Sequence, residues 1–318
     1  MTRANPIDRV PPHAFFLTSA VFHYLGPAFA VLLLARVGVL GVAWLRIAAA
    51  AAVFVAWRRP WRVLRAASWR QRRLLVGLGV VLGTMNVVFY LAIDRLPLGT
   101  VGAIEFLGPV LLGALGVRSA RNAMALVVAV VGVGLLTDVR LADEPLGFLF
   151  AFANCGLFVL YVVLGDRIAK AGGPGTGIDR LAASMLIALV VVSPIGLAEA
   201  ATTIGRPELL AAAIIVGICS SVIPYVCDQL ALARLPRATF ALLLALLPAT
   251  ATVIGLIVLR QVPAPAEVAG IGLVIAGVAL HRTTGSTPAP AAPAPVRIGG
   301  RGGDSPRKAA GRSLSSGP

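Results

Sequence analysis

The chain has 318 residues, of which 58% are hydrophobic and only 13% are charged, whereas soluble domains average roughly 45–50% and about 25%. Uncharged stretches such as 74–93 and 238–259 are each long enough to cross about 30 Å of hydrocarbon as a helix, and such stretches recur too often for one globular core. The net charge is +15, and the basic residues lie between these stretches and in a tail, without interleaved aromatic residues. This distribution argues against nucleic-acid binding. The composition therefore predicts a protein of the lipid bilayer.

The apolar runs predict an all-α membrane protein with ten transmembrane helices. Helices fit because the runs are continuous in Ala, Leu, Val and Gly and lack the alternation of barrel strands. The predicted spans are 14–34, 41–57, 74–93, 98–116, 122–138, 146–164, 181–200, 209–230, 237–259 and 266–281. A polar, Pro-rich segment, 1–13, precedes the first span without a small-residue cleavage site, so this span is predicted to be retained rather than removed as a signal peptide.

Both ends of the chain are predicted to lie on the cytoplasmic side of a bacterial inner membrane. If the N-terminus is inside, the inner segments hold 22 of the 28 Lys and Arg residues and the outer loops hold five, as the positive-inside bias requires. Residues 282–318 are rich in Pro, Ala, Gly, Ser and Arg and have too few large apolar side chains to fold. They are predicted to form a disordered basic cytoplasmic tail, and 1–13 the cytoplasmic N-terminus.

An internal repeat divides the predicted spans into two halves. The tripeptide Arg-Leu-Pro at 95–97 recurs at 234–236. The same offset of 139 residues relates Ala92 to Ala231, Thr100 to Thr239, Leu107 to Leu246, Pro109 to Pro248 and Gly116 to Gly255. Because this offset covers an odd number of spans, the copies enter the membrane in opposite orientations. The sequence therefore predicts two inverted five-helix repeats, 14–138 and 146–281, a plan of secondary transporters whose substrate site lies near the midplane.

Glu105 is the most informative polar residue within the predicted spans. It lies inside the fourth span, roughly 10 Å from its start at 1.5 Å per residue. A charge at a helix centre costs about 2.5–3.5 kcal/mol on insertion scales and usually faces a water-filled interior. Glu105 is therefore predicted to bind a substrate amine or to exchange a proton as access alternates. The alternative is a structural partnership with a hydroxyl or with Arg46, which is itself interpreted as a structural or snorkelling residue.

Other polar side chains within the spans are candidates for lining a cavity. Asp228 lies near the cytoplasmic end of the eighth span, where a functional role and interfacial snorkelling both remain open. The remaining candidates are His23 and Tyr24 in the first span, Asn86 and Tyr90 in the third, Asn154 and Tyr161 in the sixth, and Tyr225 and Gln229 in the eighth. The repeat relates the pair in the third span to the pair in the eighth. Packing or hydrogen bonding between helices, worth under about 1–2 kcal/mol, is the alternative for each of them.

No catalytic centre, metal site or cofactor is predicted. The chain contains no nucleophile elbow, Walker motif or HExxH motif, so direct drive by ATP is not expected. The cysteines lie within predicted spans and lack metal or disulfide spacing, which favours a packing role for Cys155, Cys219 and Cys227. The prolines predicted to kink helices beside the cavity, unless neighbouring groups simply tolerate them, are Pro109, Pro224 and Pro248.

Several segments resemble a known transporter family. They are Gly83-Thr84-Met85-Asn86 through Tyr90, Leu96-Pro97-Leu98-Gly99, 103–109, 147–161, 165–167, and 231–236 through Pro248. Over about residues 14–281 the chain is similar to the EamA branch of the drug/metabolite transporter superfamily, and most similar to its threonine/homoserine exporters. The resemblance implies ten helices in two inverted halves around a central cavity, and metabolite efflux. The family usually has Gly-Glu after the ninth span, where this chain has Arg260-Gln261, a departure that concerns the outer loop and the substrate.

The leading hypothesis is an exporter of amino acids or similar small polar metabolites that works by alternating access, with proton antiport through Glu105. Such a protein is not expected to be an enzyme. A homodimer remains open, because Gly-rich faces serve helix pairing and internal packing equally well. Two other classes are also open. An intramembrane enzyme acting on lipid or prenyl substrates would need acids or His gathered in one layer, and a receptor or scaffold would bind a ligand without flux.

Overall fold

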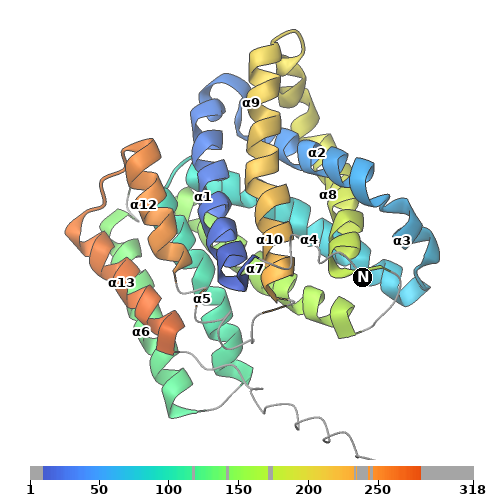
Figure 1. Cartoon of the computed structure of the whole chain (residues 1–318). Coiled ribbons are helices and arrows are strands. Elements are labelled where there is room, and N and C mark those ends of the chain that lie inside the picture. Colours follow the sequence, from blue (N-terminus) through green and yellow to red (C-terminus); the bar gives the residue numbers. More distant parts are fainter. Residues whose placement is uncertain are drawn as a thin grey trace, which may run out of the picture. The chain divides into compact units, whose positions relative to one another are not determined.

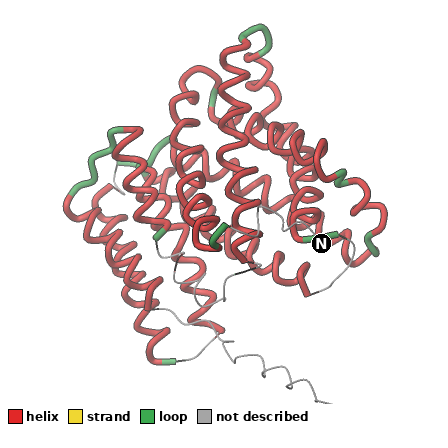
Figure 2. Tube along the Cα trace, viewed as in Figure 1, coloured by secondary structure: helices red, strands yellow, loops and turns green. Residues whose placement is uncertain are grey.

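The computed structural model describes residues 10–116, 119–140, 143–170, 175–232, 234, 243 and 246–280. Over these residues the chain is helical, and the described part contains no strand (Figure 2). All described residues belong to one unit, Met1–Thr284. The predicted disordered tail, 282–318, and most of the N-terminal segment 1–13 lie outside the described residues.

The described helices follow one another with short connections (Figure 1). In chain order the α-helices are α1 Pro12–Val37, α2 Val39–Arg58, α3 Trp61–Ala66, α4 Trp69–Ile93, α5 Leu98–Gly116, α6 Ala120–Arg140, α7 Pro145–Lys170, α8 Gly177–Ala200, α9 Pro207–Gly217, α10 Ile223–Leu232, α12 Leu247–Leu259 and α13 Pro265–Leu280. A 3₁₀ turn, η2 Ala201–Thr203, follows α8, and a π-helical segment, η3 Ile218–Val222, joins α9 to α10.

Six helical stretches are long and apolar enough to cross a membrane. They are Pro12–Val37, Val39–Arg58, Trp69–Ile93, Pro145–Ile168, Gly177–Thr203 and Pro207–Asp228. Four shorter apolar helices overlap the other four predicted spans: Leu98–Gly108, Ala120–Leu136, Leu247–Leu259 and Pro265–Leu280. The prediction of an all-helical membrane protein is confirmed, and the count of ten spans stays a prediction.

The outward-facing side chains fit a lipid environment. Large apolar residues such as Leu149, Val190 and Ile257 are 61%, 67% and 72% exposed, which would be costly over such a wide surface in water. The same helices bury small residues such as Ala50 and Ala188 against their neighbours. Apolar outward faces and small inward residues are typical of helices that pack within a bilayer.

Exposed tryptophans mark the end of the bundle that carries the arginine run. Trp57, Trp61 and Trp69 are 51%, 37% and 74% exposed and flank arginines at the end of α2, through α3 and at the start of α4. Tryptophan and arginine together favour the headgroup layer. The short helix α3 was not among the predicted elements, because its six residues are too few and too basic to register as an apolar run.

The turn between α1 and α2 consists of one residue, Gly38. Its φ of +87° lies in a region that glycine adopts without the steric cost that other residues meet. The Glu199 carboxylate, from the end of α8, accepts the Gly41 N–H at 2.8 Å. An acidic group at this position satisfies a free N–H and interacts favourably with the N-terminal end of the α2 dipole. The turn is therefore fixed by a residue more than 150 positions away.

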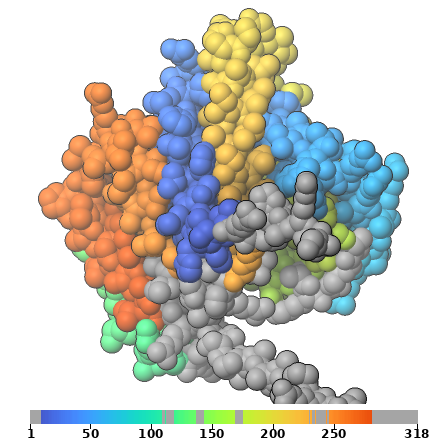
Figure 3. Space-filling view, in the orientation of Figure 1, coloured from blue at the N-terminus to red at the C-terminus, as the bar shows by residue number. Residues whose placement is uncertain are grey.

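Helices from the two predicted halves pack against one another throughout the bundle. Helix α2 packs along α8, and α6 along α13 (Figure 1). At the second crossing a Cβ on Gly270 would lie 2.7 Å from the Gly132 carbonyl oxygen, so the backbones approach closely because both residues lack side chains. Helix α1 contacts α10 and α12, and lies beside α10 in the space-filling view (Figure 3). Helix α7 contacts α4 and α5.

Candidate functional site

Glu105 lies on α5, between helices that approach closely at small residues. A Cβ on Gly102 would lie 2.9 Å from the Ala251 Cβ of α12 and 3.0 Å from the Tyr24 hydroxyl of α1. A Cβ on Gly108 would meet a side chain of α7 at 2.7 Å. Helix α5 is thus wedged between α12 and α1 at one level and against α7 at the next, and this packing leaves the Glu105 side chain only 4% exposed.

A small cavity of about 30 Å³ lies at this level. Side chains from α1, α2, α4, α5, α7 and α10 line it: His23, Pro27, Arg46, Met85, Asn86, Phe89, Glu105, Asn154, Phe158, Tyr161 and Tyr225. A cavity needs roughly 10–15 Å³ on this measure to hold one water molecule. The volume therefore suits about two waters and is smaller than an amino acid.

Several buried polar atoms in and beside the cavity form no hydrogen bond of good geometry with the described residues, although Glu105 lies near Asn154 and Tyr90 near Arg46. They are Glu105 Oε2, both amide atoms of Asn154 and the hydroxyls of Tyr24 and Tyr90. An unsatisfied buried polar group costs about 1–3 kcal/mol, and native proteins leave few of them without a functional reason. Their concentration around one cavity favours a site whose partners are supplied by a ligand or by another conformation.

Arg46 reaches the same cavity from α2. Its side chain is 5% exposed, so it does not snorkel to the membrane surface. The Nε group donates to the Ser221 hydroxyl at 2.9 Å and an Nη2 group donates to the Ser220 carbonyl at 2.8 Å. The guanidinium also lies over the Tyr90 ring, 5.5 Å from its centre, where a cation is attracted to the π face. Arg46 is therefore held in one orientation in the interior.

The π-helical segment explains why the Ser220 carbonyl is available. In an α-helix this carbonyl would accept the N–H four residues on, but that position is Pro224, which has no N–H. The helix widens instead, and the Ile223 N–H bonds to the Ile218 carbonyl. Such π segments inside α-helices occur frequently at functional sites. Close packing of Gly26 on Ser220 fits α1 against this part of the helix.

Most of the predicted site residues meet around this cavity. His23, Asn86, Glu105, Asn154, Tyr161 and Tyr225 line it, and Tyr24 and Tyr90 are fully buried beside it. The Asn86 amide donates to the Leu82 carbonyl at 2.7 Å, which satisfies only part of its capacity. The His23 ring packs edge-on against Tyr24, with centroids 5.2 Å apart.

The other predicted residues lie elsewhere. Asp228 is half-buried on α10, beside the Ser19 hydroxyl, and does not line the cavity. The side chains of Gln229 and Pro109 lie outside the described residues. Pro224 follows the π segment, in keeping with a local distortion. Pro248 lies in the first turn of α12, where proline is favoured; most of the segment 233–245 before it lies outside the described residues, so the predicted kink stays a prediction.

Arg46 is the cavity residue whose role the sequence analysis did not anticipate. The signal was present, because an arginine within a span is as costly as an acid, but no sequence feature identified its partners. The apolar wall of Met85, Phe89 and Phe158 was not predicted either. Such residues look the same in sequence whether they face lipid, another helix or a cavity.

Similarity to a named exporter decides the family. The chain is 34% identical over 255 residues to the threonine/homoserine exporter RhtA of Escherichia coli K12, covering 79% of this chain and 84% of that exporter. The chain belongs to the EamA-like transporter family. The family model matches residues 145–283, and RhtA of Salmonella typhimurium LT2 is 32% identical over the same share of both chains. A crystal structure at 21% identity, covering 84% of this chain and 96% of the other, shares the fold with a TM-score of 0.57.

The EamA family lies within the drug/metabolite transporter superfamily, so the apolar helices are those of a membrane transporter. Curated relatives of this chain are exporters and not enzymes. The chain is therefore a multi-pass membrane protein and an exporter, and the hypothesis of an intramembrane enzyme is set aside.

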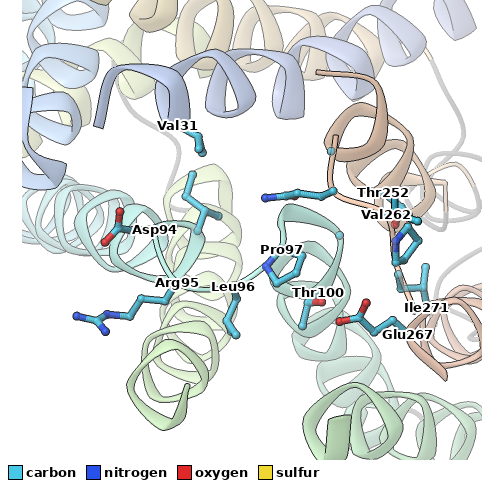
Figure 4. A pocket seen from close by; sticks show the side chains of 15 residues that line it. Val31, Asp94, Arg95, Leu96, Pro97, Thr100, Thr252, Val262, Glu267 and Ile271 are labelled. Carbon is cyan, nitrogen blue, oxygen red and sulfur yellow. The ribbon is translucent and has the colours of Figure 1, made fainter. Parts of the chain in front are cut away.

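A second, larger cavity of about 330 Å³ lies where α4 meets α5 and α12 meets α13 (Figure 4). It includes the first Arg-Leu-Pro tripeptide and Gln261, where the EamA family usually has Glu. The Gln261 side chain accepts the Leu98 N–H at 3.1 Å and so links the end of α12 to the start of α5. Figure 4 shows the buried Glu267 carboxylate directed toward Thr100, with Arg95 pointing away.

Proposed function

We propose that this protein exports threonine, homoserine or closely related small amino acids across a bacterial cytoplasmic membrane by alternating access. The observation that carries the proposal is the central cavity, where the buried side chains of Glu105, Asn154 and Arg46 lie within an apolar helical bundle. Buried charged and amide groups in a membrane interior are retained where they meet a polar ligand. The printed names of the curated relatives supply the class of substrate.

The two halves, 14–138 and 146–281, act as inverted repeats in this proposal. Helix contacts support it, because they occur in pairs that exchange under the repeat. Contacts of α1 with α10 and α12 correspond to those of α7 with α4 and α5. Helices in equivalent positions, α2 with α8 and α6 with α13, pack on each other, as elements related by a two-fold axis do. Rocking one half against the other would open the central cavity to each side in turn.

Glu105 couples export to protons in the proposed mechanism. A single carboxylate can bind either a proton or the ammonium group of an amino acid, but not both at once. If substrate leaves on the outside and a proton takes its place, the protonated carboxyl returns the carrier to the inside, and the inward proton gradient drives efflux. The Asn154 amide beside Glu105 provides a donor and an acceptor that suit both states of the carboxyl.

The larger cavity serves as the exit vestibule in this proposal. Thr100 lines it and Glu105 lines the central cavity, and five residues of helix correspond to about 7.5 Å along α5. Tyr24 and Gly102 meet between these levels and would form the closed outer gate. The arginine run near the exposed tryptophans marks the opposite, cytoplasmic end under the positive-inside bias, which puts both termini inside.

Flux from proteoliposomes tests the proposed function. Purified protein is reconstituted with labelled threonine, homoserine, lysine and glutamate inside, with and without an acidic exterior. We expect flux of threonine and homoserine above that of empty liposomes, with stimulation by the inward proton gradient. Threonine binding without flux would identify a receptor instead, and flux that ignores the gradient would remove proton coupling while leaving the exporter.

A further inference from the structure

Two buried groups of opposite charge line the central cavity without pairing. Arg46 and Glu105 are 5% and 4% exposed, and both border the same 30 Å³ space. The ion pairs among the described residues join Arg58 to Asp179 and Arg95 to Glu144, so Arg46 and Glu105 are in neither. Burial of an unpaired charge is costly, and buried charges are normally paired. Arg46 and Glu105 therefore face the same space without a direct ion pair, and the structural alternative of a partnership between them stays open.

The hydrogen bonds of Arg46 leave part of its guanidinium available. A guanidinium carries five N–H donors and no acceptor. The two bonds of Arg46, from Nε and Nη2 to Ser221 and Ser220, go to neutral oxygens along one edge of the plane. The neutral Tyr90 hydroxyl lies near the guanidinium, but among the described residues no carboxylate lies within 4.0 Å of the edge formed by Nη1 and Nη2. That edge is a planar fork of the kind that binds a carboxylate with two parallel bonds.

We infer that Arg46 binds the carboxylate of the transported amino acid while Glu105 binds its ammonium group, so that the cavity selects zwitterions that carry both charges. The inference rests on the proposed function and assigns the substrate-recognising residues of its central site. A zwitterion supplies one counter-charge to each of two groups that lack one. An amine without a carboxylate leaves Arg46 unpaired, and an acid without an amine leaves Glu105 unpaired.

The surroundings of Arg46 favour recognition over simple helix clamping. A clamp needs the two bonds to Ser220 and Ser221, which hold α2 to the π segment, but it does not need the guanidinium to border a cavity. The Tyr90 ring on one face and the fixed Nε–Nη2 edge orient the remaining fork. Lysine would supply the positive charge without this planar geometry. Replacing Arg46 with lysine therefore separates the contribution of the charge from that of the planar fork.

Competition in threonine exchange tests the inference. Reconstituted protein exchanges labelled threonine for internal threonine without a pH gradient. Unlabelled competitors are threonine, 1-aminopropan-2-ol, which lacks the carboxylate, and 3-hydroxybutyrate, which lacks the amine. For the natural sequence we expect each truncated competitor to inhibit at least about tenfold more weakly than threonine, as loss of one charge-assisted contact predicts. Equal inhibition by 1-aminopropan-2-ol would overturn the role of Arg46.

Substitutions then assign the effect to Arg46 rather than to helix packing. In Arg46→Gln we expect the KM for threonine to rise by at least about tenfold and the discrimination against 1-aminopropan-2-ol to disappear. Arg46→Lys should recover part of the affinity. Ser193→Ala is the matched control, because it removes a different bond that holds α2 to another helix, from Trp44 Nε1 to the Ser193 hydroxyl at 2.9 Å, and leaves Arg46 with both of its partners, so its KM should stay within about twofold. If Ser193→Ala loses affinity as Arg46→Gln does, loosening of α2 explains the loss and the inference is wrong.

The outcomes separate the two proposals. If threonine is exchanged but 1-aminopropan-2-ol inhibits as strongly as threonine, only the proposed role of Arg46 is wrong. Absence of exchange for threonine and homoserine defeats the proposed function, and the inference with it. The competition experiment uses the natural sequence, so it tests the role of Arg46 even if Arg46→Gln does not fold.

Discussion

Arg46 donates to the Ser220 carbonyl at 2.8 Å, across 174 residues of sequence. The contact exists because the proline four residues after Ser220 leaves that carbonyl without its helical donor. A broken helix in one half of the chain thus holds a charged residue of the other half. In a bilayer, freed backbone groups must find partners within the protein, and here the partner is a residue that also lines the transport cavity.

Pro224→Ala restores an N–H that competes with Arg46 for the Ser220 carbonyl. We expect the thermal midpoint in detergent to hold or rise, because alanine favours a regular helix, while threonine flux falls at least about tenfold as Arg46 loses a bond of about 1.5–3 kcal/mol. Pro194→Ala, in the interior of α8, is the control and should leave flux unchanged. Equal flux in both variants would show that the π segment has no part in transport.

Glu105→Gln removes the group proposed to exchange protons. We expect the stimulation of threonine flux by an inward proton gradient to disappear and exchange to fall at least about tenfold. Glu267→Gln is the control, because Glu267 is an equally buried acid, 1% exposed, that lines the other cavity. It should keep the response to the gradient. A Glu105→Gln protein that still responds would exclude this residue from coupling.

Gly102→Ala tests the close approach of α5 to α12 and α1. The added Cβ would lie 2.9 Å from Ala251 and 3.0 Å from the Tyr24 hydroxyl, so we expect a loss of about 1–3 kcal/mol from overpacking. Gly134→Ala on α6 is the control, since its Cβ meets nothing within 4 Å, and it should gain up to about 1 kcal/mol of helix propensity. Thermal unfolding in detergent measures both. Equal midpoints would mean that α5 and α12 are not tightly packed at this level.

Accessibility of matched positions tests the inverted repeat. In a background without Cys155, Cys219 and Cys227, we expect Arg95→Cys to react with a membrane-impermeant maleimide added to intact cells. Arg234→Cys, its equivalent in the second half, should react only after the membrane is opened. Labelling of both from the same side would rule out opposite insertion of the two halves. Insensitivity of threonine export to each substitution alone is the functional control.

The helical class and much of the central site were predictable because a membrane imposes strong constraints on sequence. Hydropathy reveals long helices, and Glu105 and Asn154 stood out because polar groups in a span need a reason. The π segment and the partners of Arg46 were not predictable. They depend on which helices face one another. Pro224 in an apolar run predicts a kink, but the sequence does not indicate which side chain donates to the carbonyl that the proline leaves free.

Pro248 and Asp228 show the same limit. The repeat matched Pro248 to Pro109 and suggested a common role, but the sequence did not indicate that Pro248 would fall in the first turn of α12. Asp228 has the same kind of side chain as Glu105 and also falls within a predicted span. It is absent from the cavity lining, whereas Tyr225 on the same helix is part of it, and which face of a helix meets a cavity is not given by span-by-span interpretation.

The narrow central cavity has a consequence for how strongly this carrier should hold its cargo. When the binding-competent conformer is only a small fraction of the population, the apparent dissociation constant rises by the inverse of that fraction. A conformer with room for about two waters must expand before it can accept cargo, so weak apparent affinity is expected. Under the proposed alternating access, export would then rise steeply only when the internal concentration of substrate is high.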